Sequence, residues 1–144
     1  INTILKAAME APSAGNQQPW HFIIVRDKQK LADIPEYHPY AKMAPKAPVA
    51  IVVCGDPDGK KWPDFWVQDC SAAVQNMLLA ARDLGIGSVW TGVYPVQERV
   101  EGLRKIFNIP ENVIPFAVVP LGWPEGDFKS AERYNEKLVH ENEW

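Results

Sequence analysis

Hydrophobic positions near the start of the chain recur at the spacing of a helix, and a proline then ends the pattern. The apolar side chains that share one face are Ile1, Ile4, Leu5, Ala8 and Met9. Pro12 cannot continue such a helix, because its ring clashes with the preceding turn and it lacks an N–H. No capping residue precedes the pattern, so we expect that residues upstream of Ile1 are missing from this sequence.

Apolar runs and helical stripes then alternate along the chain. Strands are expected at residues 20–25, 49–54, 86–93 and 113–121. Helices are expected at residues 28–34, 65–84 and 95–107. Asp27 is placed to cap the first of these helices, Gly85 to end the second, and Pro95 to open the third. The run 49–54 is apolar throughout, which is typical of a strand buried on both faces.

These elements indicate one α+β domain over residues 1–144, with a small mixed β-sheet packed against flanking helices. Residues 35–48 contain four prolines and are expected to be irregular, apart from one helical turn around residues 41–44.

The last segment of the chain, residues 122–144, is polar and has no core-forming period. It nevertheless carries Tyr134, Leu138 and Trp144. Such a tail is either disordered or laid across a partner subunit, and its apolar side chains favour the second interpretation.

Composition narrows the class of protein. The 15 basic and 18 acidic residues give a net charge of −3, which does not support binding to nucleic acid or to an anionic membrane. No apolar segment approaches the roughly 18 residues of a membrane span. Cys54 and Cys70 lie in apolar segments without metal-ligand spacing, so buried free thiols are favoured over a disulfide or a metal site. A cytoplasmic location is expected from this.

Several common catalytic and nucleotide-binding motifs are absent. The sequence has no Gly-x-Ser-x-Gly, no His-Glu-x-x-His and no P-loop lysine motif. The segment 85–90 lacks the third glycine of a dinucleotide fingerprint and leads into an expected strand. We therefore expect no Rossmann unit, and we assign no side chain as catalytic acid or base.

The loop between the first helix and the first strand is rich in hydrogen-bonding groups. It reads Ala-Pro-Ser-Ala-Gly-Asn-Gln-Gln-Pro-Trp-His-Phe over residues 11–22. Its composition fits a plain turn. It equally fits a rigid loop in which Ser13, Asn16 and Gln18 donate and accept hydrogen bonds with a large polar ligand, and composition alone does not separate these interpretations.

Four motifs resemble the nitroreductase family of FMN flavoproteins, and the similarity covers nearly the whole chain. They are the loop at residues 11–22, the helix at 66–81, the segment Gly-Ile-Gly-Ser-Val-Trp-Thr-Gly-Val-Tyr-Pro at 85–95, and the C-terminal pattern at 120–124 with 139–144. Their order and spacing make the match specific.

The resemblance implies a homodimer with FMN in a cleft between the subunits. By position, Pro12, Ser13 and Asn16 would contact a flavin held mainly by the partner subunit, and Gln18 of the same loop is also expected to bind the cofactor. Thr91 and Gly92 would lie beside the isoalloxazine ring and offer a backbone N–H near N5, which suits glycine because no Cβ blocks the approach. The guanidinium of Arg133 would pair with the phosphate.

Further positions match the family less directly. Gln68 would join the cofactor site at the start of the long helix, beside Asp69, which could equally be structural at a helix N-terminus. Trp62, Phe65 and Trp66 would form a wall against which a substrate stacks, although ordinary packing accounts for the three aromatic residues equally well. Lys42 and Lys46 are candidates to stabilise negative charge on the reduced flavin.

The activity that the resemblance implies is transfer of hydride from NAD(P)H, through flavin N5, to a nitroaromatic, a quinone or a similar small acceptor. NAD(P)H would visit as a transient co-substrate, giving a ping-pong mechanism. The family's N-terminal Arg-x-Ser-x-Arg segment, which grips the flavin phosphate, does not occur in this sequence. The alternatives are a specialised reductive dehalogenase, or a flavin-binding or cofactor-less homodimer without catalysis.

Overall fold

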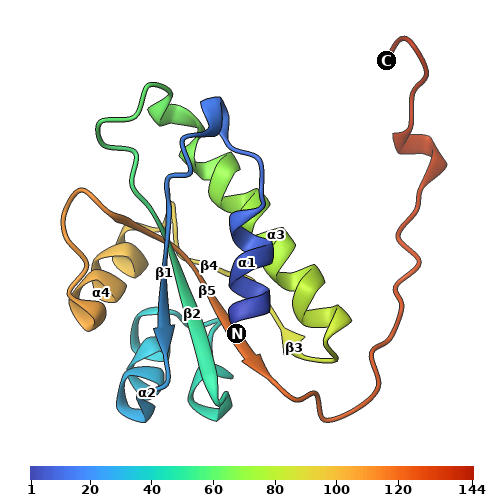
Figure 1. The fold of residues 1–144 in the computed structure, drawn as a ribbon. Coiled ribbons are helices and arrows are strands. Elements are labelled where there is room, and N and C mark those ends of the chain that lie inside the picture. The colour runs from blue at the N-terminus through green and yellow to red at the C-terminus, as the bar shows by residue number, and fades with distance from the viewer.

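The centre of the protein is a five-stranded sheet, shown in Figure 1. The computed structural model describes all residues 1–144. The strands are β1 (Trp20–Val25), β2 (Val49–Gly55), β3 (Gly87–Ser88), β4 (Thr91–Gly92) and β5 (Ile114–Gly122). Their order across the sheet is β1-β2-β5-β3, and β4 also pairs with β5.

Every strand pairing is antiparallel, so the expectation of a mixed sheet was wrong. The α+β class itself is confirmed. The periodicity of a strand reveals which side chains are buried but not the direction of its neighbour, because side chains alternate in the same way in both kinds of ladder.

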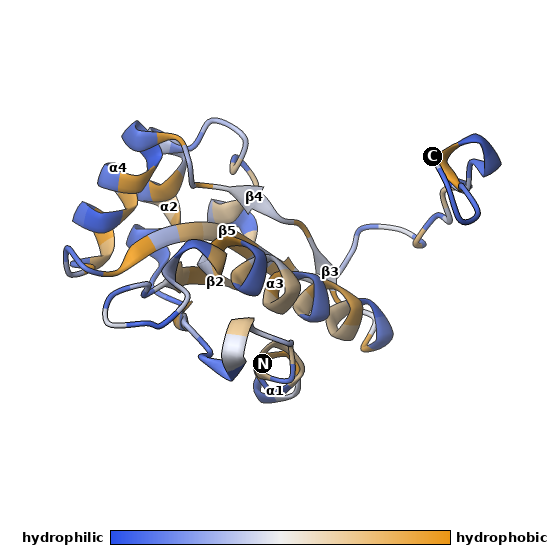
Figure 2. Ribbon diagram, turned by 90° about the horizontal axis from the view of Figure 1, so that it is seen from above, coloured by the Kyte–Doolittle hydropathy of each residue, from blue (hydrophilic) through white to orange (hydrophobic).

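The helices cover both faces of the sheet, as Figure 2 shows. The helices α1 (Asn2–Met9) and α3 (Trp66–Asp83) pack on one face. The helices α2 (Lys28–Tyr37) and α4 (Gln97–Phe107) pack on the other. Four single turns of 3-10 helix lie in the connections and in the tail, at Ala14–Asn16, Ala44–Lys46, Pro63–Phe65 and Glu136–Leu138.

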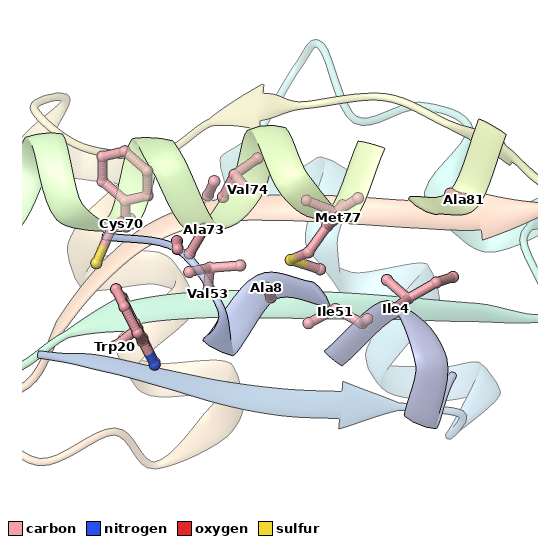
Figure 3. Packing of buried hydrophobic residues seen from close by; sticks show 14 of the residues in the cluster. Ile4, Ala8, Trp20, Ile51, Val53, Cys70, Ala73, Val74, Met77 and Ala81 are labelled. Carbon is pink, nitrogen blue, oxygen red and sulfur yellow. The ribbon is translucent and has the colours of Figure 1, made fainter. Parts of the chain in front are cut away.

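The central strand β2 joins the two halves of the core, because each of its residues is buried. Ile51 and Val53 point toward Met77 of α3, as Figure 3 shows. Val52 and Cys54 alternate to the other face, in the cluster that contains Leu103 of α4. The apolar run therefore forms the doubly buried strand that the sequence predicts.

Several element boundaries agree closely with the sequence pattern. The helix expected at residues 65–84 is α3, and Gly85 ends it with φ of +72°. Asp27 caps α2 as expected, since its Oδ1 accepts a hydrogen bond of 2.9 Å from the N–H of Lys30. Strand β1 spans the expected residues 20–25.

Other boundaries differ from the sequence pattern. Helix α2 continues beyond Ile34 to Tyr37, and the turn expected at residues 41–44 lies at Ala44–Lys46. Helix α4 begins at Gln97, two residues after Pro95. The strand expected at 86–93 divides into β3 and β4, because the intervening Val89 and Trp90 leave the ladder with β5.

The tail, residues 123–144, runs away from the rest of the chain in Figure 1. None of its residues is buried, and Trp144 is fully exposed. The tail contacts the helical layer near its start, where the guanidinium of Arg82 lies 3.7 Å from the ring centroid of Phe128. None of the helices combines the length and the apolar character that a membrane crossing requires.

Candidate functional site

The hydrogen-bonding loop between α1 and β1 is held in an uncommon backbone conformation. Gly15, Asn16 and Gln18 have φ of +57°, +55° and +49°. Left-handed φ is unfavourable for a residue with a side chain, so Gln18 adopts it only because its surroundings fix it.

Asp69 supplies one of the bonds that hold this loop. Its Oδ1 accepts a hydrogen bond of 3.0 Å from the N–H of Ala14, and its side chain is buried. Asp69 lies in the first turn of α3, where the helix dipole favours a carboxylate. The structure therefore gives Asp69 an anchoring role, which is the structural interpretation that the sequence left open.

The polar side chains of the loop also bind one another. The Oγ of Ser13 accepts a hydrogen bond of 3.0 Å from the N–H of Gln18, and Nε2 of Gln18 donates to Oδ1 of Asn16 at 3.0 Å. These groups are exposed or half-buried, so they remain accessible to a ligand. The loop is thus an ordered array of amides and a hydroxyl rather than a plain turn.

A residue that the sequence pattern did not single out ties the loop to the segment before α3. The Oε1 of Gln17 accepts hydrogen bonds from the N–H groups of Lys61 and, at 3.1 Å, of Trp62. The indole of Trp62 lies so close to Gly15 that a Cβ there would be 3.0 Å from Cδ1. The only sequence signal was one more amide in an amide-rich loop.

A groove of about 380 Å³ opens between this loop and the start of α3. Its lining includes the expected cofactor residues Pro12, Ser13 and Gln68 and the expected substrate residue Phe65. The structure therefore brings together, in one chain, residues that are more than fifty positions apart in the sequence.

The three expected substrate aromatics do not share one environment. Trp62 and Phe65 are each 48% exposed, so both present ring surface to solvent. Trp66 is buried in the core. Its indole occupies the space above Gly55, where a Cβ would collide with it, and it packs edge-on against Tyr94 at 4.8 Å. Trp66 consequently offers no open face for stacking in this chain.

Thr91 and Gly92 lie elsewhere, on the edge of the sheet beyond β5. The N–H of Val93 donates to the carbonyl of Phe116 at 2.9 Å, and Gly92 is paired with Ala117. Hydrogen-bonded and non-hydrogen-bonded pairs alternate in an antiparallel ladder, so the N–H and C=O of Gly92 face away from β5. A Cβ built on Gly92 would meet nothing within 4 Å, so the space beside this backbone is open.

The remaining charged candidates lie apart from both groups. Arg133 is exposed in the tail. Lys46 lines a different groove, of about 340 Å³, together with Ser88 and Trp123. Lys42, four residues before Lys46, is exposed. One chain therefore presents the expected cofactor residues in separate groups, at the loop, at the Gly92 edge and in the tail.

The two cysteines take no part in these groups. Both are free and buried, as the sequence predicts. Burial raises the pKa of each thiol to about 12, and the neighbouring Asp69 carboxylate adds to the effect on Cys70. Thiols in that state are not nucleophiles at neutral pH.

Known proteins resemble this chain over its whole length. The model of the nitroreductase family matches residues 1–45 and 35–123. A protein of Archaeoglobus fulgidus is 57% identical over 148 residues, which cover 100% of this chain and 85% of that protein. A protein of Methanothermobacter thermautotrophicus is 54% identical over 144 residues, which cover 100% of this chain and 75% of that protein. Both are provisionally named NADH dehydrogenase/NAD(P)H nitroreductase.

The fold agrees with solved structures of such proteins. An FMN-dependent nitroreductase from Clostridium difficile R20291 superposes with a TM-score of 0.91 at 28% sequence identity, covering 99% of this chain and 86% of that one. The resemblance indicated by the sequence motifs is confirmed, and the chain belongs to the nitroreductase family.

Proposed function

We propose that the protein is an FMN-dependent oxidoreductase that transfers hydride from NAD(P)H to a nitroaromatic, a quinone or a similar small acceptor. The observation that carries the proposal is the Gly92 edge, where the backbone N–H faces away from β5 and no atom lies within 4 Å of the position that a Cβ would occupy. Support for the cofactor comes from the related FMN-dependent nitroreductase, and support for NAD(P)H from the names of the two archaeal relatives.

The groups in this chain fit the parts of FMN that they would contact. A flat ring system can approach Gly92 closely, because no Cβ stands in the way. The loop at Pro12–Gln18 offers amide and hydroxyl groups, which suit the polar edge of the ring and the ribityl chain. Arg133 carries a guanidinium, whose planar fork matches a phosphate.

In the proposed reaction FMN carries out the redox step, and the protein binds and orients the FMN. Bound FMN would supply the redox step, accepting hydride at N5 and passing it to the acceptor. Gly92 would hold the ring by its backbone N–H, and Ser13, Asn16, Gln18 and Gln68 would orient the ring's polar edge. No side chain is assigned as a general acid or base.

NAD(P)H and the acceptor would use the same space in turn. The chain has no glycine-rich dinucleotide turn to hold NAD(P)H permanently. Trp62 and Phe65, each 48% exposed, would stack on whichever planar substrate is present. This alternation is a ping-pong mechanism.

We further propose a homodimer in which each site draws on both chains. The cofactor residues of one chain fall into separate groups, and a second copy could complete each group. The exposed aromatic residues of the tail also require a partner surface to be buried. Free buried cysteines favour a reducing compartment such as the cytoplasm.

Steady-state kinetics test this function most simply. The protein, loaded with FMN, is assayed by varying NAD(P)H at several fixed concentrations of a quinone or a nitroaromatic. Parallel double-reciprocal lines are expected, and intersecting lines would refute alternation at one site. Turnover of halogenated phenols without turnover of nitroaromatics would instead favour the dehalogenase alternative.

A further inference from the structure

A buried histidine lies behind the Gly92 edge without hydrogen-bond partners. His38 is 1% exposed, and its two ring nitrogens are the buried side-chain polar atoms that lack a partner in the structure. Burying a polar group without a hydrogen bond costs about 1–3 kcal/mol. An apolar residue would avoid that cost, so packing alone does not account for histidine at this position.

Arg99 reaches the same backbone from α4. Its NH1 group donates a hydrogen bond of 2.8 Å to the carbonyl oxygen of Gly92. Its guanidinium also lies 5.3 Å from the ring centroid of Tyr40, whose ring packs edge-on against His38 at 6.5 Å. His38, Tyr40 and Arg99 thus form one layer behind Gly92, which we call the backing layer.

The backing layer acts on the residue that has the most conformational freedom in this segment. Glycine has no Cβ to restrict it, so an isolated glycine at a sheet edge can rotate its peptide groups freely. The residue before it is fixed, because Oγ1 of Thr91 donates to the carbonyl of Val118 at 2.7 Å. Arg99 fixes the carbonyl on the other side of Gly92. The direction of the Gly92 N–H therefore depends on both contacts.

We propose that Arg99 is a positioning residue, which holds Gly92 in the conformation that directs its N–H toward the bound flavin, and that His38 supports Arg99 through the ring of Tyr40. This inference rests on the proposed function. Neither residue is assigned a contact with the cofactor, because Arg99 acts through the carbonyl of Gly92 and His38 acts through Tyr40.

The charge state of His38 is compatible with its neighbour. Burial lowers the pKa of His38 from 6.5, and the positive charge of Arg99 lowers it further, while the backbone groups of Gly92, His38 and Thr91 oppose both effects. A neutral imidazole can lie beside a guanidinium without repulsion between like charges.

The test compares Arg99→Ala and Arg99→Lys with Lys105→Ala. Lys105 is exposed on the same helix, so its loss removes the same charge without touching Gly92. The first readout is the backbone amide signal of Gly92 in protein labelled with 15N-glycine, recorded without FMN. The second is the dissociation constant of FMN, and the third is the visible absorption band of the bound flavin.

Arg99→Ala is expected to shift and broaden the Gly92 signal and to weaken FMN binding by about tenfold, equivalent to about 1.4 kcal/mol. Its absorption band should move toward that of free FMN. Arg99→Lys should recover part of each effect, because its ammonium can still donate to the carbonyl. Lys105→Ala should match the wild type in all three.

His38→Phe tests the second residue with a side chain of similar shape and no polar atom. A role in packing alone predicts an unchanged Gly92 signal, unchanged FMN affinity and equal or higher thermal stability, and that result would overturn the assignment of His38. The proposal predicts a shifted signal and weaker FMN binding in a variant that is still folded.

The proposal and the proposed function fail in different ways. A wild-type protein that binds no FMN would overturn the function and this inference together. A wild-type protein that binds FMN and is reduced by NAD(P)H, with an Arg99→Ala variant unchanged in affinity, spectrum and Gly92 signal, would overturn this inference alone.

Discussion

The body of the chain, residues 1–122, and the tail, residues 123–144, differ in how far their side chains are buried. All 38 buried residues belong to the body. In the tail, Trp123 is 79% exposed, Tyr134 is 81% exposed and Trp144 is fully exposed. The body closes a core on each face of its sheet, whereas most of the large apolar side chains of the tail are exposed in this chain.

The contrast shows that the spacing of apolar residues, and not their presence alone, determines whether a segment packs within its own chain. Burial of apolar surface stabilises by roughly 25 cal/mol per Å², so a segment folds on its own only if its apolar positions can meet. The body has apolar positions at strand and helix spacing. The tail has apolar residues without such spacing, and it requires a surface outside the chain to bury them. The proposed partner is a second copy of the protein.

Removal of the tail should have the largest effect on assembly and the smallest on the fold. Deletion of residues 130–144 is expected to convert the proposed dimer to a monomer while far-UV circular dichroism stays nearly unchanged, because no buried residue is lost. Sedimentation velocity measures the first result. Arg133→Ala is the control that removes the proposed phosphate contact but leaves the tail, and it should weaken FMN binding in a protein that remains dimeric. A truncated chain that is still dimeric would contradict the account of the tail.

A cavity in the body should produce the opposite result. Met77→Ala empties a fully buried position between α3 and β2, so it is expected to lower the free energy of unfolding by about 2–5 kcal/mol. Urea unfolding followed by circular dichroism measures the change. Gln75→Ala, on an exposed position of the same helix, should change it by less than about 0.5 kcal/mol. Equal effects of the two substitutions would mean that the packing of α3 on β2 is not the source of stability.

The anchor of the hydrogen-bonding loop should have an intermediate effect. Asp69→Ala removes the acceptor for the N–H of Ala14 and is expected to cost about 1–3 kcal/mol of stability and to weaken FMN binding. Asp69→Asn keeps an oxygen at the same position and should retain most of both. Thermal unfolding and an FMN titration give the two values. Should Asn behave like Ala, the carboxylate charge and not the hydrogen bond would be the important feature.

The smallest predicted effect is a dependence of stability on pH from His38. Its folded-state pKa lies below the unfolded value of 6.5, so the unfolded chain takes up the proton first as pH falls. The stability linked to neutral His38 is fully present above that value and is lost as pH falls through the folded pKa. Urea unfolding at about pH 7.5 and about pH 5.5 should show a smaller loss in His38→Phe than in the wild type. The same loss in both proteins would assign the pH dependence to other groups.

Sequence patterns were informative wherever a structural feature is local. The run at Val49–Cys54 and the cap at Asp27 each depend on neighbours a few residues away, and both are present in the structure. The helical stripe of α3 was also found, although Leu84 at its end is exposed. The sequence could not show which of the three aromatic residues is buried, because the burial of Trp66 depends on the absence of a Cβ at Gly55 in strand β2.

In the candidate site, too, the sequence predicted local segments but not the tertiary contacts between them. The loop at Pro12–Gln18 and the Thr91–Gly92 segment could be selected by family resemblance. The contacts that shape them could not, because Gln17 binds residues 61 and 62 and Arg99 binds Gly92 through tertiary structure. The directions of the strands were missed for a related reason, since pairing is a property of two segments and periodicity describes only one.

The central claim, that this chain binds FMN and uses it to oxidise NAD(P)H, is tested most directly by an anaerobic titration of the FMN-loaded protein with NADH and with NADPH. The account predicts that the visible flavin band bleaches at about one equivalent of reduced nucleotide per FMN and returns when a quinone is added. A protein that stays colourless in excess FMN, or a bound flavin that neither nucleotide reduces, would contradict it.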